Sequence, residues 1–323
     1  MTRKPSPTGP AVAHRTSALK SLMGAGLGFG ASMLAGGLVE AHAFLIRRHR
    51  IPILAPGSAP IRVLHISDLH LLARQDDALR FLAGLADLQP DLVVSTGDHV
   101  SQASAIAPML AALGPLLRLP GVFVFGSNDF VKPHFRNPLG YLWRGATGRH
   151  QRHHAEDPAL TLPTGELRDQ LASHGWTYLD DVDTTLSVAG RRVQLRGTGD
   201  AHVGRDHYDA VAGPLDAGAD VWLGVTHAPY QRVLNAMVDD GFPLILAGHT
   251  HGGQVCLPTG RPIVTNCDID PGHAKGLSRW EHDGAAAWMY VSAGMGTSPY
   301  APYRLFCRPE AALLTLVASD TRE

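Results

Sequence analysis

The chain has 323 residues, of which 45% are hydrophobic and 18% charged, and its formal net charge is −1. This length and composition suffice for one large globular domain with a substantial core. The near-neutral charge excludes bulk electrostatic attraction to nucleic acid or anionic lipid, so no nucleic-acid binding is expected.

The N-terminal region differs from the rest of the chain. Residues 1–17 are polar and proline-rich, and we expect them to be disordered. Residues 22–39 carry no charge, at the lower limit of length for crossing a bilayer. Three interpretations of residues 18–40 stay open: a membrane anchor, which would make the protein membrane-associated, an export signal, or a helix packed on the domain. Basic residues on both sides give no orientation.

Residues 41–323 are expected to form the globular domain, and they alternate between extended and helical patterns at first. β-Branched runs predict strands, and apolar residues at helical spacing predict helices. Pro52 places the first strand at a sheet edge. We expect strands at 44–54, 61–67, 91–96 and 121–125, and helices at 76–88 and 103–117.

Residues 132–165 break this alternation and predict an insertion or long loop. Regular structure is expected to resume afterwards, and the alternation of strands with helices indicates an α/β fold. We expect helices at 166–174 and 230–238, and strands at 185–188, 192–196, 220–225, 243–247, 262–264, 287–292 and 311–317.

Five of the expected strands end in residue types that bind metals. Ligands of α/β sheets bind outside the carboxyl ends of the strands, so these side chains should converge. A single aspartate at a strand end is usually a turn or cap residue, but five successive cases are hard to explain by caps. The residues are Asp68, His70, Asp98, Asn128, His227, His249 and His251.

This set combines two carboxylates, one amide and four imidazoles, which suits Mn, Fe or Zn better than Ca or Mg. Seven ligands are too many for one ion and fit two ions bridged by one carboxylate. Such a pair can clamp a phosphoryl group and activate a hydroxide. The sequence therefore predicts phosphoester hydrolysis by direct attack on phosphorus, without a covalent enzyme intermediate.

These motifs resemble the five sequence blocks of the calcineurin-like metallophosphoesterases, in order and spacing, over residues 60–255. Residues 65–70 and 248–254 are most similar to a bacterial subgroup with an N-terminal membrane or export segment. The resemblance implies a four-layer α/β/β/α sandwich. The blocks are Asp68-x-His70, Gly97-Asp98, Gly126-x-Asn128, His227 and Gly248-His249-x-His251.

The resemblance also implies a ligand assignment for two ions. Asp68, His70 and His251 would bind the first ion, and Asp98 would bridge to the second. The remaining ligands of the second ion would be Asn128, His227 and His249.

The third block departs from the family pattern. The family usually has Gly-Asn-His followed by Asp or Glu, whereas this chain has Gly126-Ser-Asn-Asp129. We interpret Asp129 as standing where the family has a histidine that stabilises phosphate charge or protonates the leaving alkoxide. Either Asp129 with a raised pKa acts as general acid, or His202 takes that role. The rival hypothesis is a slowed step that cleaves only activated leaving groups.

Other polar residues receive more modest interpretations. His99 is expected to hydrogen-bond to nearby backbone rather than to bind metal, and Asp200 and His202 to line the substrate side. Arg304 and Arg308 could meet a phosphate, but surface pairing is the favoured interpretation for each. A Cys256–Cys267 disulfide stays open.

The sequence thus favours a metal-dependent phosphoesterase beside a membrane, with lipid- or nucleotide-linked phosphodiesters or pyrophosphates as candidate substrates. No specific protein partner is inferred. The alternative is a catalytically weakened metal-binding scaffold that recruits partners.

Overall fold

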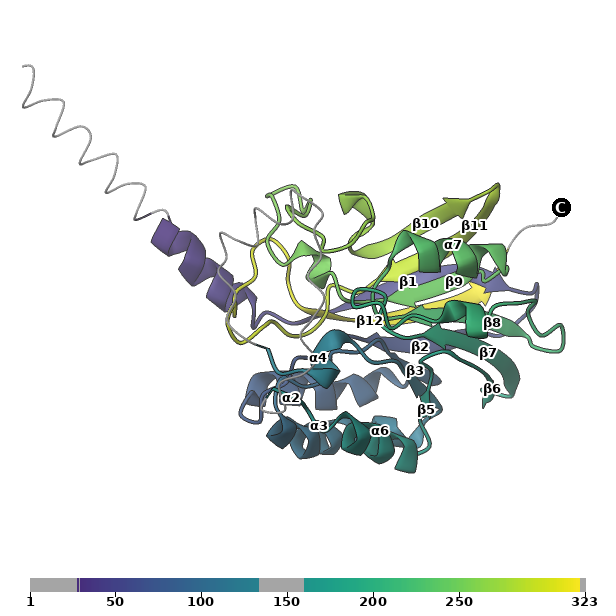
Figure 1. The fold of residues 1–323 in the computed structure, drawn as a ribbon, viewed down its shortest axis with the longest axis horizontal. Helices are drawn as coiled ribbons and strands as arrows, with labels where there is room; N and C mark the ends of the chain where they lie inside the picture. Colours follow the sequence, from purple (N-terminus) through teal and green to yellow (C-terminus); the bar gives the residue numbers. More distant parts are fainter. Residues whose placement is uncertain (1–27, 29, 134–159, 320–323) are drawn as a thin grey trace, which may run out of the picture.

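The computed structural model describes residues 28, 30–133 and 160–319, in which two six-stranded sheets lie face to face (Figure 1). In the first sheet the strand order is β1 (Leu45–Leu54), β12 (Glu310–Ala318), β2 (Ile61–Ile66), β3 (Leu92–Ser95), β4 (Gly121–Phe123) and β5 (Thr177–Tyr178). In the second sheet it is β10 (Gly276–His282), β11 (Ala285–Val291), β9 (Leu244–Ala247), β8 (Val221–Thr226), β7 (Arg191–Thr198) and β6 (Val182–Val188).

Each sheet has a parallel centre. Strands β2 to β5 are parallel in the first sheet, and β7, β8, β9 and β11 are parallel in the second. Parallel strands that follow one another through helices bring their carboxyl ends to one edge of the sheet. The turns after β2, β3, β4, β8 and β9 therefore gather at the same end of the molecule.

An aliphatic core fills the space between the sheets. Val63 and Val94 of the first sheet are fully buried there with Leu195, Leu223 and Leu246 of the second. Burying one such side chain contributes about 1.5–3 kcal/mol. This double burial explains the nearly continuous apolar runs of the central strands.

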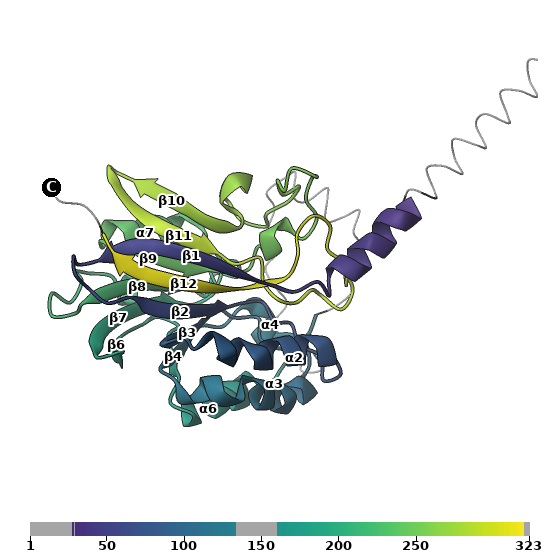
Figure 2. The same cartoon turned by 180° about the vertical axis from the view of Figure 1, so that it is seen from behind.

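Helices cover the outer faces of both sheets. Figures 1 and 2 show α2 (Asp76–Gly84), α3 (Ile106–Leu113) and α6 (Thr164–Ser173) on the first sheet and α7 (Gln231–Asp239) on the second. Leu82 and Leu167 pack on the first sheet, whereas Val233 and Met237 pack on the second. The protein is therefore an α/β four-layer sandwich, as expected.

Some local expectations were wrong. Residues 262–264 do not form a strand, because Pro262 makes only an isolated bridge to Cys256. Strands β5 and β10 were not anticipated. The three cysteines are free, and Cys256 packs against Cys307 rather than Cys267. Residues 134–159 of the predicted insertion lie outside the described residues, and Thr164 already begins α6.

Residues 30–40 form a helix that precedes β1 in the chain. This helix extends away from the sandwich (Figure 2). The expected disordered residues 1–17, and part of the 18–40 segment, lie outside the described residues. Among the helices that the structure describes, none combines the length and apolar character required to cross a bilayer.

Candidate metal centre

The seven candidate ligands occupy turns at the carboxyl ends of five parallel strands. Asp68 and His70 follow β2, and Asp98 follows β3. Asn128 lies in α4 (Ser127–Phe130), directly after β4. The second sheet contributes the three remaining histidines, namely His227 after β8 and His249 and His251 after β9.

Tight backbone packing holds these turns together. The Asp68 amide donates to the Gly97 carbonyl at 2.9 Å, and the His249 amide donates to the Asp68 carboxylate at 2.9 Å. A Cβ at Gly248 would lie 1.9 Å from the Ser67 hydroxyl oxygen. The turns of the two sheets therefore approach so closely that a side chain at Gly248 would separate them.

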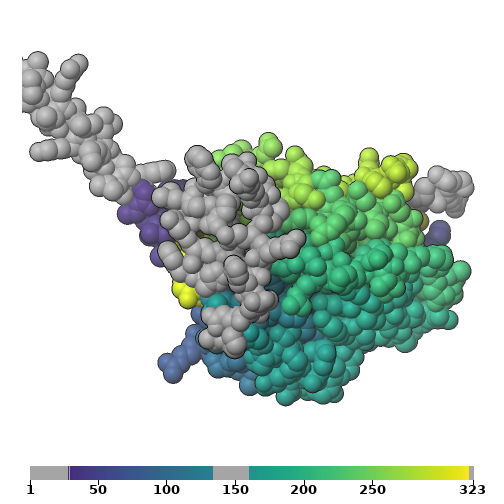
Figure 3. Space-filling view, viewed as in Figure 1, coloured from purple at the N-terminus to yellow at the C-terminus, as the bar shows by residue number. Residues whose placement is uncertain are grey.

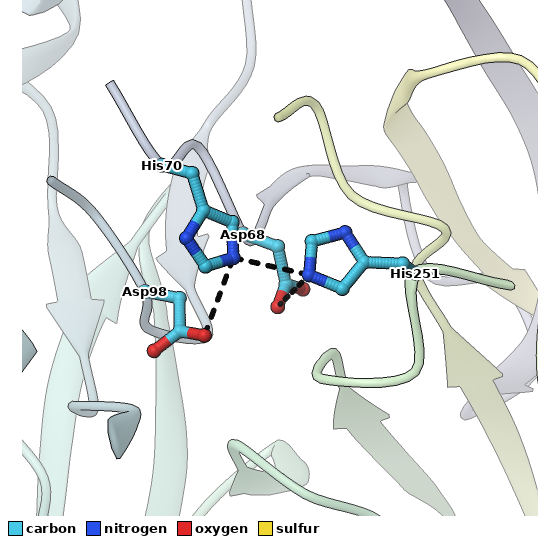
Figure 4. A group of neighbouring side chains, drawn as sticks. All are labelled: Asp68, His70, Asp98 and His251. Carbon is cyan, nitrogen blue, oxygen red and sulfur yellow. Dashed lines mark hydrogen bonds and ion pairs between the residues drawn. The ribbon is translucent and has the colours of Figure 1, made fainter. Parts of the chain in front are cut away.

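The first group of ligands comprises Asp68, His70, Asp98 and His251 (Figure 4). One ligand atom from each of the four lies within 4.8 Å of the others. The His70 and His251 Nε2 atoms are 3.0 Å apart, and His70 Nε2 is 3.3 Å from Asp98 Oδ2. Imidazole nitrogens and carboxylate oxygens that converge in this way fit a divalent transition-metal ion.

A second group of candidate ligands lies on the other side of Asp98. His227 Nε2 lies 3.6 Å from Asp98 Oδ2 and 3.3 Å from His249 Nδ1. The Asn128 side-chain amide donates to Asp98 Oδ2 at 2.7 Å. The buried His249 Nε2 has no hydrogen-bond partner. Asp98 thus contacts both groups.

Backbone carbonyls orient two of the ligand rings. His227 Nδ1 is 2.6 Å from the Thr96 carbonyl oxygen, and His251 Nδ1 is 3.2 Å from that of Gly296. A carbonyl only accepts, so Nδ1 is the donor in each of these contacts and Nε2 is the ring nitrogen that faces the site. A hydrogen bond from the other ring nitrogen to a carbonyl is typical of metal-binding histidines.

The buried charges at the centre shift one another's pKa values. Burial alone would lower the pKa of His227, but the carboxylates of Asp98, Asp200 and Asp68 raise it to about 10. Burial would raise the pKa of Asp98, yet His227, His70 and the Asn128 hydrogen bonds lower it to about 2. These carboxylates stabilise positive charge at this position, which is the electrostatic condition for holding a cation.

Asp129 lies beside the candidate ligands, and backbone amides of the ligand turns bind its carboxylate. Its fully buried carboxylate accepts hydrogen bonds from the backbone N–H groups of Asp98, His99 and Gly126, at 2.7–3.0 Å. Gly126 is the N-cap residue of α4, so the carboxylate of Asp129 satisfies a backbone N–H at the start of that helix. The geometry favours a register in which Gly126 and Asp129 match the first and last residues of the family's third block. In that register Ser127 stands where the family has asparagine and Asn128 where it has histidine, so the assignment of Asn128 to the second ion rests on its contact with Asp98 and not on the register.

The other sequence candidates surround this centre. His99 is buried, and its ring contacts the Ser95 hydroxyl and the Asp129 carboxylate instead of backbone. The His202 ring lies 4.4 Å from the His249 ring, and its Nδ1 is 3.0 Å from the Tyr230 hydroxyl. Asp200 is fully buried and accepts from the His202 amide.

Arg304 has a role that sequence reasoning missed. The expected surface pair is wrong, because Arg304 is fully buried. Its Nη2 donates to the carbonyls of Ala293, Gly294 and Gly296 at 2.7–3.1 Å, and its Nη1 lies 3.4 Å from the His251 carbonyl. Arg308 likewise donates to backbone carbonyls rather than to an acid. No local pattern in the sequence signals these contacts.

The four-layer sandwich with Asp and His ligands at its strand ends defines a metal-dependent phosphoesterase. The family model for calcineurin-like phosphoesterases matches residues 61–253. The chain belongs to the calcineurin-like phosphoesterase family and is a phosphoester hydrolase.

Known proteins with related sequences carry corresponding names. A protein of Escherichia coli named phosphodiesterase YaeI is 28% identical, over 85% of this chain and 88% of its own length. The Bacillus subtilis metallophosphoesterase YkuE, itself uncharacterized, is 24% identical, over 95% and 98% respectively. Among solved structures, TT1561 of Thermus thermophilus is 13% identical with a TM-score of 0.37, covering 73% of this chain and 91% of that one.

Proposed function

We propose that the protein is a two-metal phosphoester hydrolase in which water attacks phosphorus directly. Support comes from the position of Asp98, whose carboxylate contacts His70 on one side and His227 and Asn128 on the other. A carboxylate between two ligand groups is suited to bridge two cations. The first ion would be held by Asp68, His70 and His251, and the second by Asn128, His227 and His249.

Two Mn, Fe or Zn ions, when bound, supply Lewis acidity for the phosphoryl oxygens and lower the pKa of water toward neutrality. The chain's own residues hold the ligand atoms in place through hydrogen bonds between the turns. His202, beside His249, is the group that we assign to protonating the leaving oxygen. Asp129 is assigned to positioning, because its carboxylate is already engaged by backbone N–H groups.

Phosphodiesters and pyrophosphates are the substrate classes that we favour, and lipid- or nucleotide-linked esters are candidates among them. The name of the related phosphodiesterase supports the diester class.

The test is hydrolysis of bis(p-nitrophenyl) phosphate by metal-stripped protein to which Mn²⁺ is added back. Activity should return with bound metal and saturate at two ions per chain. Asp98→Asn should reduce hydrolysis to background and lower the metal content, whereas Asp169→Asn, at an exposed site, should match the wild type. Saturation at one ion with full activity would contradict the two-metal proposal.

The second candidate function is a metal-binding scaffold, which the unusual third block favours. Protein that binds two Mn²⁺ ions yet hydrolyses neither monoesters nor diesters would support it.

We also propose that residues 18–40 associate the protein with a membrane, on the basis of their uncharged stretch. Fractionation of cells that produce the full chain tests this proposal, because recovery in the soluble cytoplasmic or secreted fraction would contradict it.

A further inference from the structure

Exposed large hydrophobic side chains gather at one end of the molecule. Among the described residues, all of them lie in the helix at 30–40 or in two loops, at 255–263 and 299–306. Val39 is 73% exposed. The others are Leu34, Leu38, Leu257, Ile263, Tyr300 and Phe306. We call these three segments the apolar rim, and contiguous apolar surface of this kind marks an interaction site.

Hydrogen bonds join the three segments into one surface. The Arg304 amide donates to the Gly37 carbonyl at 2.9 Å, and the Phe306 amide donates to the Glu40 carboxylate at 2.9 Å. The Cys256 amide donates to the Leu305 carbonyl at 2.8 Å. In Figure 3 the helix, in purple, and the nearby yellow residues of the C-terminal part lie at the same end of the molecule. The rim is therefore a single face.

This face adjoins the metal centre. Gln254, three residues after the ligand His251, donates from its side chain to the carbonyls of Ala301 and Tyr303 at 2.8 and 2.9 Å. Arg304, at the centre of one rim loop, holds the carbonyls of Gly294 and Gly296 beside Asp68 and His70. A surface that covers the rim thus lies next to residues that contact the metal centre.

The charges of the rim indicate what covers it. Only three of its residues are charged: Glu40, Arg261 and Arg304. Arg304 is buried, and the Glu40 carboxylate is engaged by the amides of Phe306 and Cys307. Arg261, in a hairpin between Leu257 and Ile263, is thus the exposed cation of an otherwise apolar face. An apolar face with a flanking cation suits the interface of an anionic bilayer.

The sequence before the helix also supports a lipid bilayer as the surface that covers the rim. The helix at 30–40 continues the uncharged stretch that begins at residue 22, so the apolar character extends past the described structure. We propose that the apolar rim docks on the surface of a lipid bilayer, with the metal centre at the lipid–water boundary. Building on the proposed hydrolase function, the substrate class is then an amphiphilic phosphoester whose apolar part stays in the lipid.

Fluorescence quenching tests the docking without any assay of activity. The full chain carrying Leu257→Trp is mixed with vesicles of phosphatidylethanolamine and phosphatidylglycerol whose acyl chains are brominated. Its emission, corrected for the native tryptophans, should be quenched. Thr185→Trp, on exposed β6, is the matched control and should not be quenched. Equal emission changes in the two variants would overturn the docking proposal, even if residues 1–29 hold the protein on the vesicle.

Hydrolysis measurements test the substrate class. Leu257→Asp combined with Ile263→Asp should reduce cleavage of a vesicle-borne phosphodiester about 10-fold and leave that of bis(p-nitrophenyl) phosphate unchanged. Equal rates on the vesicle-borne ester would overturn the inference. Absence of all hydrolysis by the wild type would overturn the proposed function alone, because quenching does not depend on it. A dimer in gel filtration that these substitutions convert to monomer would assign the rim to a second copy and overturn lipid docking.

Discussion

Five of the seven candidate ligands have a left-handed backbone conformation that residues other than glycine rarely adopt. The φ angles of Asp68, His70, Asp98, His249 and His251 lie between 42° and 69°. Such conformations cost about 1–3 kcal/mol each and persist only where surrounding contacts enforce them. The hydrogen bonds between the turns supply that enforcement here, so the site is preorganised at a cost to stability.

Substitutions at Asp129 and at Asn128 should have different effects, the first mainly on stability and the second mainly on hydrolysis. Asp129→Asn places an amide donor against a backbone N–H, which costs about 1–3 kcal/mol. Its relative rates on nitrophenyl and alkyl esters should stay those of the wild type. Asn128→Ala should lose hydrolysis with a smaller loss of stability. Urea denaturation and both ester assays check this. A selective loss of alkyl-ester cleavage in Asp129→Asn would restore Asp129 as general acid.

The buried carboxyl group of Asp180, which is not a candidate ligand, should make the stability of the protein depend on pH. Burial raises its pKa to about 7, and its carboxylate is contacted by the Tyr178 hydroxyl and the Phe125 amide. A carboxyl group whose pKa is higher in the folded than in the unfolded state loses its stabilising effect as the pH rises through the folded pKa. The wild type should therefore lose stability between about pH 4 and pH 7.

Asp180→Asn should remove this dependence. At about pH 8 the variant should be about 1–2 kcal/mol more stable than the wild type, and the difference should vanish at about pH 4. Urea unfolding at both pH values measures it. A variant less stable than the wild type at the higher pH would show that Asp180 is ionised without penalty in the folded protein.

At the scale of elements, the turn between β4 and α4 leaves no room for a side chain at Gly126. A Cβ at Gly126 would lie 2.2 Å from Asp98 Oδ1 and 2.5 Å from His227 Nε2. Gly126→Ala should therefore displace ligands of both groups and reduce metal content and hydrolysis by more than 10-fold. Gly165→Ala, exposed in α6 with no atom near its Cβ, should add about 0.5–1 kcal/mol of stability. Metal analysis of both variants checks this, and full metal binding by Gly126→Ala would contradict it.

Most elements of the sandwich could be predicted because the pattern that defines them is local. The strands β2, β3, β8 and β9 are short runs of buried β-branched and aliphatic residues that end at ligand turns. By contrast, β5 has only two residues, and β10 is a half-exposed strand defined by its pairing with β11. Neither feature is visible in a short window of sequence.

The candidate site likewise has parts that a local sequence pattern predicts and parts that it does not. Its ligands could be proposed from single strand ends, because each turn carries its own motif. The environment of Arg304 depends on carbonyls from separate loops, and that of Asp129 on amides from two turns. Contacts of this kind arise only when distant segments meet. The sequence therefore indicated the chemistry of the centre but not the groups that position it.

At the scale of the whole molecule, the metal centre joins the two sheets. Asp68 and Asp98 belong to turns of the first sheet, whereas His227, His249 and His251 belong to the second. An ion held by ligands of both sheets binds the folded state and not the separated sheets. Metal binding should therefore stabilise the entire fold against unfolding.

Thermal unfolding measures this stabilisation. Each bound Mn²⁺ ion, at a free concentration of 100 times its Kd, should add about 2.7 kcal/mol, which corresponds to a rise in Tm of about 5–10 °C per ion. Asp68→Asn combined with His251→Ala should abolish the part of the rise that the first ion contributes, since both substitutions remove ligands of that ion. The control Asp169→Asn should keep it in full. An equal rise in the double variant would show that Mn²⁺ stabilises the protein elsewhere, so the centre would not be the cation site that links the sheets.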